Sequence, residues 1–160
     1  MNKAQVKAII KLLKSEDGTR PALQRVFEQG GYIWATDGYV ALEVGQAQDD
    51  IKGKCITLPT LIAWNATHTH ATDMISEDEW QDNDEPTPDM VSLLHKEYDT
   101  LTEPPRVNID NLKLACDFLG IKSMSLEKHD NCYRVKPLNT DEQPIIIKAM
   151  ESQAYVMRLL

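Results

Sequence analysis

The sequence lacks any apolar run that approaches the roughly 20 residues needed to span a bilayer, and its 160 residues contain only three cysteines. The N-terminal segment MNKAQVKAII has a charged, amphipathic pattern instead of the apolar centre of a signal peptide. The cysteines, Cys55, Cys116 and Cys132, are odd in number and far apart, which fits neither a disulfide framework nor a zinc site. We therefore expect a cytoplasmic protein with reduced thiols and no membrane segment.

Motifs of catalysis are also missing. The chain has no Gly-rich phosphate loop, no nucleophile elbow and no paired metal-ligand motif. His68 and His70 would place two imidazoles on one strand face near Asp73, but the spacing fixes no third ligand. We expect no enzyme activity, no cofactor and no metal. The alternative is an enzyme with an unfamiliar site in residues 47–104.

Basic residues are absent from one acidic stretch. Between Asp73 and Asp89 the chain has eight acidic residues and no Lys or Arg, so this stretch carries the whole net charge of −8. The neutral remainder can still present a local basic face. Residues 66–89 are interpreted as a mobile, solubilising loop. The alternative is that the loop competes with DNA for a basic surface, with an exposed Trp80 as its anchor.

The remaining sequence predicts a single α+β domain, because 160 residues suffice for one hydrophobic core. Unit one, residues 1–46, begins with an amphipathic helix over residues 2–14, for which Asn2 is the N-cap. Strands follow within residues 21–44, with turns at Gly30-Gly31 and Thr36-Asp37-Gly38. We expect a polar insert over residues 47–104, with a helix that begins at Pro88. Its apolar residues would form one packed face: Met90, Val91, Leu93, Leu94 and Tyr98.

Unit two, residues 105–160, repeats this order of elements. A short strand is expected over Arg106–Ile109, followed by a helix over residues 110–119 that is closed by Gly120. Four further strands are expected after this helix: Ser123–Lys128, Cys132–Lys136, Pro144–Lys148 and Ala154–Leu159. Two such units predict that both helices pack on one face of an antiparallel sheet.

Four short segments resemble the DNA polymerase III β subunit, the bacterial sliding clamp. They are Thr19-Arg20-Pro21-Ala22-Leu23, Ala35-Thr36-Asp37-Gly38-Tyr39-Val40-Ala41-Leu42, Val107-Asn108-Ile109-Asp110-Asn111-Leu112 and Tyr155-Val156-Met157-Arg158-Leu159. The resemblance implies a clamp-like domain that performs no chemistry. Clamp rings contain six such domains and this chain has room for one. A ring would therefore require a homo-oligomer whose edge strands pair between subunits, or partners that supply the other domains.

The resemblance also implies a DNA-facing surface. Lys3, Lys7, Lys11 and Lys14 share an arc of roughly 80° on the first expected helix. In clamps, the helices line the ring, and their basic side chains contact duplex phosphates without reading sequence. The alternative for these lysines is an ordinary solvated helix face.

A second implied surface is a pocket that binds short peptides of polymerases and repair proteins. The clamp pattern assigns to it Leu23, Thr36, Gly38, Tyr39, Val40, Met157, Arg158 and Leu159. In clamps, the two sets of residues come from neighbouring domains, so we expect both to meet here only if two copies pair. The alternative is that Leu23 and Val40 are core residues and that the Thr-Asp-Gly turn is structural.

These observations leave two main hypotheses for function. The first is a processivity factor that oligomerises around duplex DNA or binds it without sequence specificity. The second is a clamp-like interaction module, of a type suited to a phage or mobile element, that binds a polymerase or a host clamp without encircling DNA.

Overall fold

The computed structural model describes residues 1–15, 20–95, 108–120, 134–135, 144–149 and 152–157. Its strands form one sheet in the order β5-β4-β1-β2-β3-β8-β7-β6, in which every neighbouring pair is antiparallel. The strands are β1 (Arg25–Gln29), β2 (Tyr32–Thr36), β3 (Val40–Gln46), β4 (Lys54–Thr57), β5 (Gln81–Asp82), β6 (Arg134–Val135), β7 (Pro144–Ala149) and β8 (Ser152–Met157). Pairing of β3 with β8 joins the strands of the two halves into one sheet.

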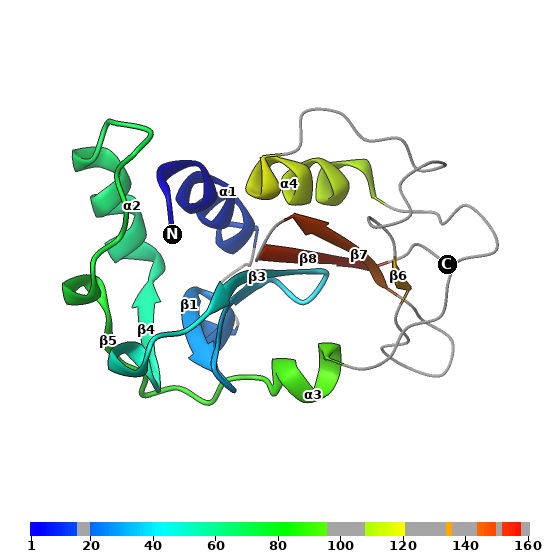
Figure 1. Ribbon diagram of the computed structural model, residues 1–160, viewed down its shortest axis with the longest axis horizontal. Coiled ribbons are helices and arrows are strands. Elements are labelled where there is room, and N and C mark those ends of the chain that lie inside the picture. The colour runs from blue at the N-terminus through cyan, green and yellow to red at the C-terminus, as the bar shows by residue number, and fades with distance from the viewer. Residues whose placement is uncertain (16–19, 96–107, 121–133, 136–143, 150–151, 158–160) are drawn as a thin grey trace.

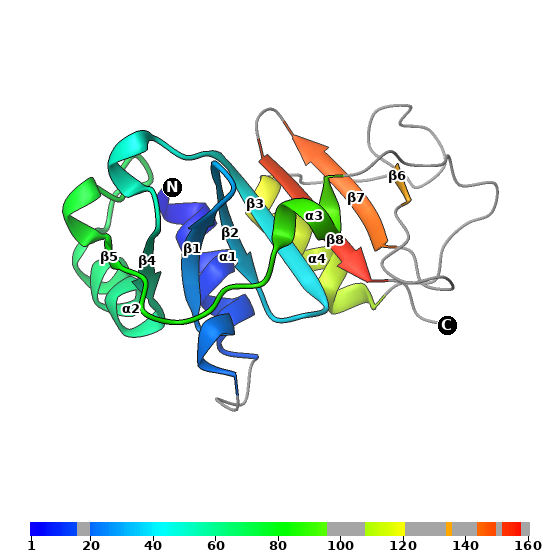
Figure 2. The same ribbon diagram turned by 90° about the horizontal axis from the view of Figure 1, so that it is seen from below.

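Helices lie on both faces of this sheet (Figure 1). Helix α1 (Lys3–Leu13) lies between α2 (Leu58–Thr67) and α4 (Ile109–Leu119), contacts both and covers one face. The short helix α3 (Met90–Leu94) lies on the opposite face, which is turned toward the viewer in Figure 2. The described residues therefore confirm an α+β fold with an antiparallel sheet, and α1 and α4 share one face as expected.

The first helix forms where the sequence predicts it. The Asn2 side chain accepts a hydrogen bond from the Gln5 amide at 3.0 Å, and the Gln5 side chain accepts one from the Asn2 amide at 3.0 Å. This reciprocal pair is a capping box that satisfies two amides with no partner inside the helix. Val6 and Ile9 are fully buried in the core between this helix and the sheet.

Alternating side chains divide the sheet into two cores. On the face under α1 and α4, the strand residues of the core are Val26, Ala35, Val40, Leu42, Ile56, Ala154 and Val156. On the face under α3, they are Phe27, Trp34, Ala41, Cys55 and Tyr155. Both faces of the central strands are therefore buried, and α3 is needed to cover the second one.

Three local predictions are wrong. Residues 21–23 form a 3-10 turn, so β1 begins only at Arg25. The helix near Pro88 begins at Met90 because the Asp89 side chain accepts a hydrogen bond from the Ser92 amide at 3.1 Å, which makes Asp89 the N-cap. Asn108, expected in a strand, caps α4. The expected strand Ser123–Lys128 lies outside the described residues.

The acidic stretch is also not the free loop that the sequence suggested. It contains β5, which pairs with β4, and the Asn2–Met74 bridge attaches it to the start of α1. Trp80 is partly buried against the main core, so it is not an exposed anchor. Arg25 donates to Asn83 at 2.8 Å and forms a 3.1 Å ion pair with Asp84. Hydrogen bonding to Arg25 lowers the pKa of Asp84.

Candidate functional site

The turn between β2 and β3 is fixed by hydrogen bonds between its own residues. The Asp37 carboxylate accepts from the Tyr39 and Val40 amides at 2.9 and 2.8 Å. The Thr36 hydroxyl accepts from the Gly38 amide at 3.0 Å and donates to the Val40 carbonyl at 2.8 Å. Gly38 has a φ of 92°, a conformation that favours glycine. These contacts form a rigid turn that carries Tyr39 at its tip.

Contacts from outside the hairpin hold the same turn in place. The Ser15 hydroxyl, just after α1, donates to Asp37 at 2.9 Å. A side chain on Gly38 would place its Cβ 3.4 Å from a guanidinium nitrogen of Arg20. Arg20 directly precedes the 3-10 turn that carries Leu23. Residues 20–23 and the Thr-Asp-Gly turn, separate in the sequence, are therefore neighbours in the structure.

A pocket of about 260 Å³ opens beside this turn. Its lining includes all five residues that the sequence assigns to the first part of a peptide pocket: Leu23, Thr36, Gly38, Tyr39 and Val40. Tyr39 is 65% exposed, so its ring stands at the opening of the pocket. Val40 also has a structural role, because its buried side chain belongs to the core under α1 and α4.

The second wall of the pocket comes from residues that the clamp pattern does not predict. Met90, Leu93 and Leu94 of α3 line it, together with Pro88. Met90 and Leu94 are buried, whereas Leu93, which the sequence placed with them on one packed face, is 42% exposed. The apolar spacing of residues 90–94 indicated a helix, but nothing in the sequence indicated which surface this helix covers.

Of the second predicted set, only Met157 lies within the described residues, and it is not part of the pocket lining. Val156 pairs with Val40, and Tyr155 lines the pocket beside the turn. Met157 is the last residue of β8, and Arg158 and Leu159 lie outside the described residues. The expectation that the two sets meet in one pocket only if two copies pair stays a prediction, although β3 and β8 are neighbours within one chain.

The exposed lysine face is narrower than expected. Lys7, Lys11 and Lys14 are exposed along α1. Lys3 is only 8% exposed, because its ammonium group donates to the backbone carbonyls of Asn65 and His68 at the end of α2 and lies 5.7 Å from the centre of the Trp64 ring. Lys3 therefore binds the C-terminus of a neighbouring helix and does not belong to the exposed face.

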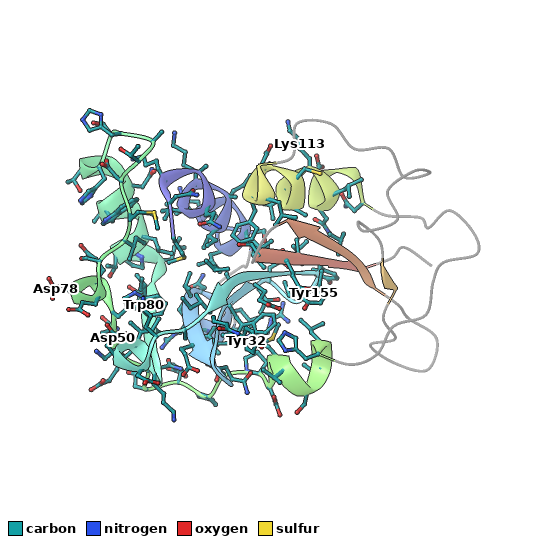
Figure 3. All side chains as sticks on the ribbon, in the orientation of Figure 1. Tyr32, Asp50, Asp78, Trp80, Lys113 and Tyr155 are labelled. Atoms are coloured by element: carbon teal, nitrogen blue, oxygen red, sulfur yellow. The ribbon has the colours of Figure 1, made fainter. Side chains whose placement is uncertain are left out.

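Helix α4 adds charges of both signs beside the α1 lysines. Lys113 is exposed on it, as are Asp110 and Asp117. Figure 3 shows Lys113 far from the end of the molecule where Asp50, Asp78 and Trp80 lie. At that acidic end, Glu77 shares a hydrogen bond with Asp50, and this contact and the Asp50 charge raise the pKa of Glu77. The surface formed by α1 and α4 therefore carries charges of both signs, and the acidic stretch adds a second group of carboxylates at the other end of the molecule.

A buried carboxylate connects α3 to the sheet. Glu43 on β3 is 2% exposed and accepts from the Tyr155 hydroxyl at 2.9 Å, the Gln153 amide group at 3.1 Å and His95 Nε2 at 2.8 Å. Because a carboxylate only accepts, Nε2 of His95 must carry a proton. Tyr32 and Tyr155 lie on the side of the sheet that faces α3 (Figure 3). Sequence patterns did not indicate this cluster, because Glu43, Tyr155 and His95 come from β3, β8 and the end of α3.

The described residues provide no metal site. They contain no group of three or more His, Cys, Asp or Glu side chains that are placed to bind a metal ion. His68 stacks on Trp64, with 4.4 Å between ring centres, while the His70 amide donates to Asp73 at 2.9 Å. Burial raises the pKa of the Cys55 and Cys116 thiols, which keeps both protonated near neutral pH.

No helix in the described part of the chain is both long and apolar enough to cross a bilayer. The chain matches no family model, no curated protein and no solved structure. The likeness to sliding clamps therefore rests on the four sequence segments alone.

Proposed function

We propose that this protein is a clamp-like interaction module that binds a short apolar segment of a replication protein, such as a polymerase or another clamp. The observation that supports this proposal best is that five residues chosen from a sequence pattern line one pocket. Two of them, Leu23 and Tyr39, come from separate segments of the chain. Thr36, Gly38, Tyr39 and Val40 belong to one turn, so the informative part of the match is that Leu23 lines the same pocket.

The chemistry of the pocket suits an apolar peptide side chain. Leu23, Met90 and Leu94 provide aliphatic walls, and the exposed ring of Tyr39 stands at the edge. Apolar pockets with an aromatic rim gain binding free energy from desolvation, and exposed Tyr residues are frequent anchors of protein interfaces. The pocket also lies on the face opposite α1 and α4, so a peptide there would leave the helix surface free.

The test is capture of a bacterial sliding clamp or of a labelled clamp-binding peptide by the immobilised protein. We expect capture by the wild type and loss of capture by Tyr39→Ala. The matched control is Ile62→Ala, which removes another exposed large apolar side chain, on α2. Equal capture by wild type and Tyr39→Ala would contradict the proposal, as would equal losses in the two variants.

A second candidate function is sequence-independent binding of duplex DNA by the helix surface. The observation that favours it is the row of exposed Lys7, Lys11 and Lys14 on α1, with Lys113 on the adjacent α4. Phosphate contacts of this kind weaken as salt rises. Asp110 and Asp117 on α4 oppose such contacts, which places this function second.

Salt-dependent retention on duplex DNA tests the second function. If Lys11 contacts a phosphate, Lys11→Ala lowers the slope of log affinity against log salt by about 0.9. Lys52→Ala, which removes an exposed lysine next to the acidic end, leaves that slope unchanged. If the wild type is not retained on duplex DNA at low salt, the DNA-binding function is contradicted.

A further inference from the structure

The two walls of the pocket are attached to the molecule in different ways. The Thr36–Val40 turn is held by four hydrogen bonds from or to its own side chains and by the contact from Ser15. The opposite wall belongs to residues 89–95, which we call the α3 arm. Its helix has only five residues, too few to be stable without the surface beneath it.

Side chains attach the arm at each of its ends. At the start, Gln29 donates to the Asp89 carboxylate at 3.0 Å and accepts from the Val91 amide at 3.2 Å. At the other end, His95 donates to Glu43 at 2.8 Å and packs edge-on to Tyr32, with 4.5 Å between ring centres. Between these ends, Met90 and Leu94 are buried in the second core.

The contact at His95 can open without leaving a buried charge unpaired. Glu43 keeps two other donors, the Tyr155 hydroxyl and the Gln153 amide group, when His95 leaves. An abandoned buried carboxylate would oppose opening strongly, but one that retains two hydrogen bonds opposes it much less. The turn on the other side is held by several hydrogen bonds that would all have to break for it to move. We therefore expect the arm to be the wall that moves.

We propose that the α3 arm is a self-docked wall that limits access to the pocket, and that an incoming apolar side chain binds between the turn and the arm after the arm has moved outward. This inference rests on the proposed peptide function, because it concerns the same pocket. The exposed Leu93 is the first arm residue to be displaced, since it lines the opening without being buried. The affinity of the pocket then depends on the fraction of molecules in which the arm is displaced.

A reversible cross-link provides the sharpest test. A Cβ built on Gly30 lies 3.4 Å from the Cβ of Val91, close to the separation found in disulfides. The double variant Gly30→Cys with Val91→Cys, in a Cys116→Ser and Cys132→Ser background, would tie the arm to the β1–β2 turn when oxidised. Gly30 has a φ of 64°, so the cysteine is strained there, but the reduced form of the same variant has the same strain and is its own control.

The probe is the apolar dye anilinonaphthalene sulfonate, whose fluorescence reports an accessible apolar pocket without any assumption about the natural partner. We expect the reduced variant to bind the dye about fivefold or more tightly than the oxidised variant, as for other coupled equilibria. His95→Ala should bind more tightly than the wild type. His95→Gln, whose amide can still donate to Glu43, should lie closer to the wild type.

Equal dye affinities of the oxidised and reduced variants would overturn the proposal, whatever His95→Ala does. The same measurements with the labelled clamp-binding peptide separate the two claims. Dye affinity that depends on the cross-link, without peptide binding in any form, supports the arm and contradicts the peptide function. Peptide binding that is the same in both redox forms supports the function and contradicts the arm.

Discussion

At the scale of single residues, Lys3 shows how a surface pattern can conceal a structural role. Its spacing with Lys7 and Lys11 is regular, yet its ammonium group binds two carbonyls at the end of α2. The last carbonyls of a helix have no partners inside the helix, and a cation there also interacts favourably with the helix dipole. Lys3 therefore contributes to the packing of α1 against α2.

We predict that Lys3→Ala lowers the free energy of unfolding by about 1–3 kcal/mol, because two partly buried carbonyls lose their donor. The measurement is urea unfolding followed by circular dichroism. Lys7→Ala is the control: it lies one turn further along α1 but is exposed, so its effect should stay within about 0.5 kcal/mol. Similar losses in both variants would mean that the Lys3 contact contributes nothing.

Gly38 is a second residue whose role follows from local geometry. Its φ of 92° strains any residue with a side chain, and a Cβ there would approach Arg20. Gly38→Ala should therefore lower the free energy of unfolding by about 1–2 kcal/mol. Gly38→Asn should cost less, since Asn accepts positive φ more readily. The measurement is the thermal unfolding midpoint of each variant. An unchanged midpoint for Gly38→Ala would contradict the claim that a side chain is strained at this position.

At the scale of elements, the acidic stretch behaves as a part of the sheet. The Arg25–Asp84 pair and the β4–β5 pairing attach it to the first half. The pKa of Asp84 is lowered by Arg25, so the folded state binds the Asp84 proton less readily than the unfolded state. The pair therefore stabilises the fold above the unfolded pKa, and this contribution is lost as the pH falls through the lowered folded pKa.

This sign predicts the behaviour of Asp84→Asn. Its thermal midpoint should be lower than that of the wild type at neutral pH, and the gap should close as the solution is acidified. The difference is small because the Asp84 side chain is exposed. In an Arg25→Met background the same substitution should have no pH-dependent effect. A gap that persists at acidic pH, or in the Arg25→Met background, would show that the ion pair is not its cause.

Elements with strong local signals could be predicted from the sequence. The capping box at Asn2 and the Gly30-Gly31 turn are decided by neighbouring residues, and both helices α1 and α4 formed close to the expected bounds. The placement of α3 and the attachment of Trp80 could not be predicted. Both depend on contacts between residues far apart in the chain, and hydrophobic periodicity carries information only about local structure. The pocket was predictable on one side only, for the same reason.

At the scale of the whole molecule, the described sheet ends in very short strands. β5 and β6 have two residues each, and short edge strands discourage pairing between chains. The interaction-module proposal therefore predicts a monomer of 18.1 kDa across concentrations by light scattering. A concentration-dependent species of six chains would instead favour the ring hypothesis and the DNA function.

Hydrogen–deuterium exchange with and without a clamp-binding peptide is the most direct test of whether the pocket beside Tyr39 binds peptides. We predict that the peptide slows exchange in residues 36–40, which form the rigid turn, and changes exchange in residues 88–95, while the exposed lysine face of α1 stays unaffected. Slowed exchange confined to α1 and α4, or no change anywhere at saturating peptide, would contradict the claim that the pocket beside Tyr39 is the binding site.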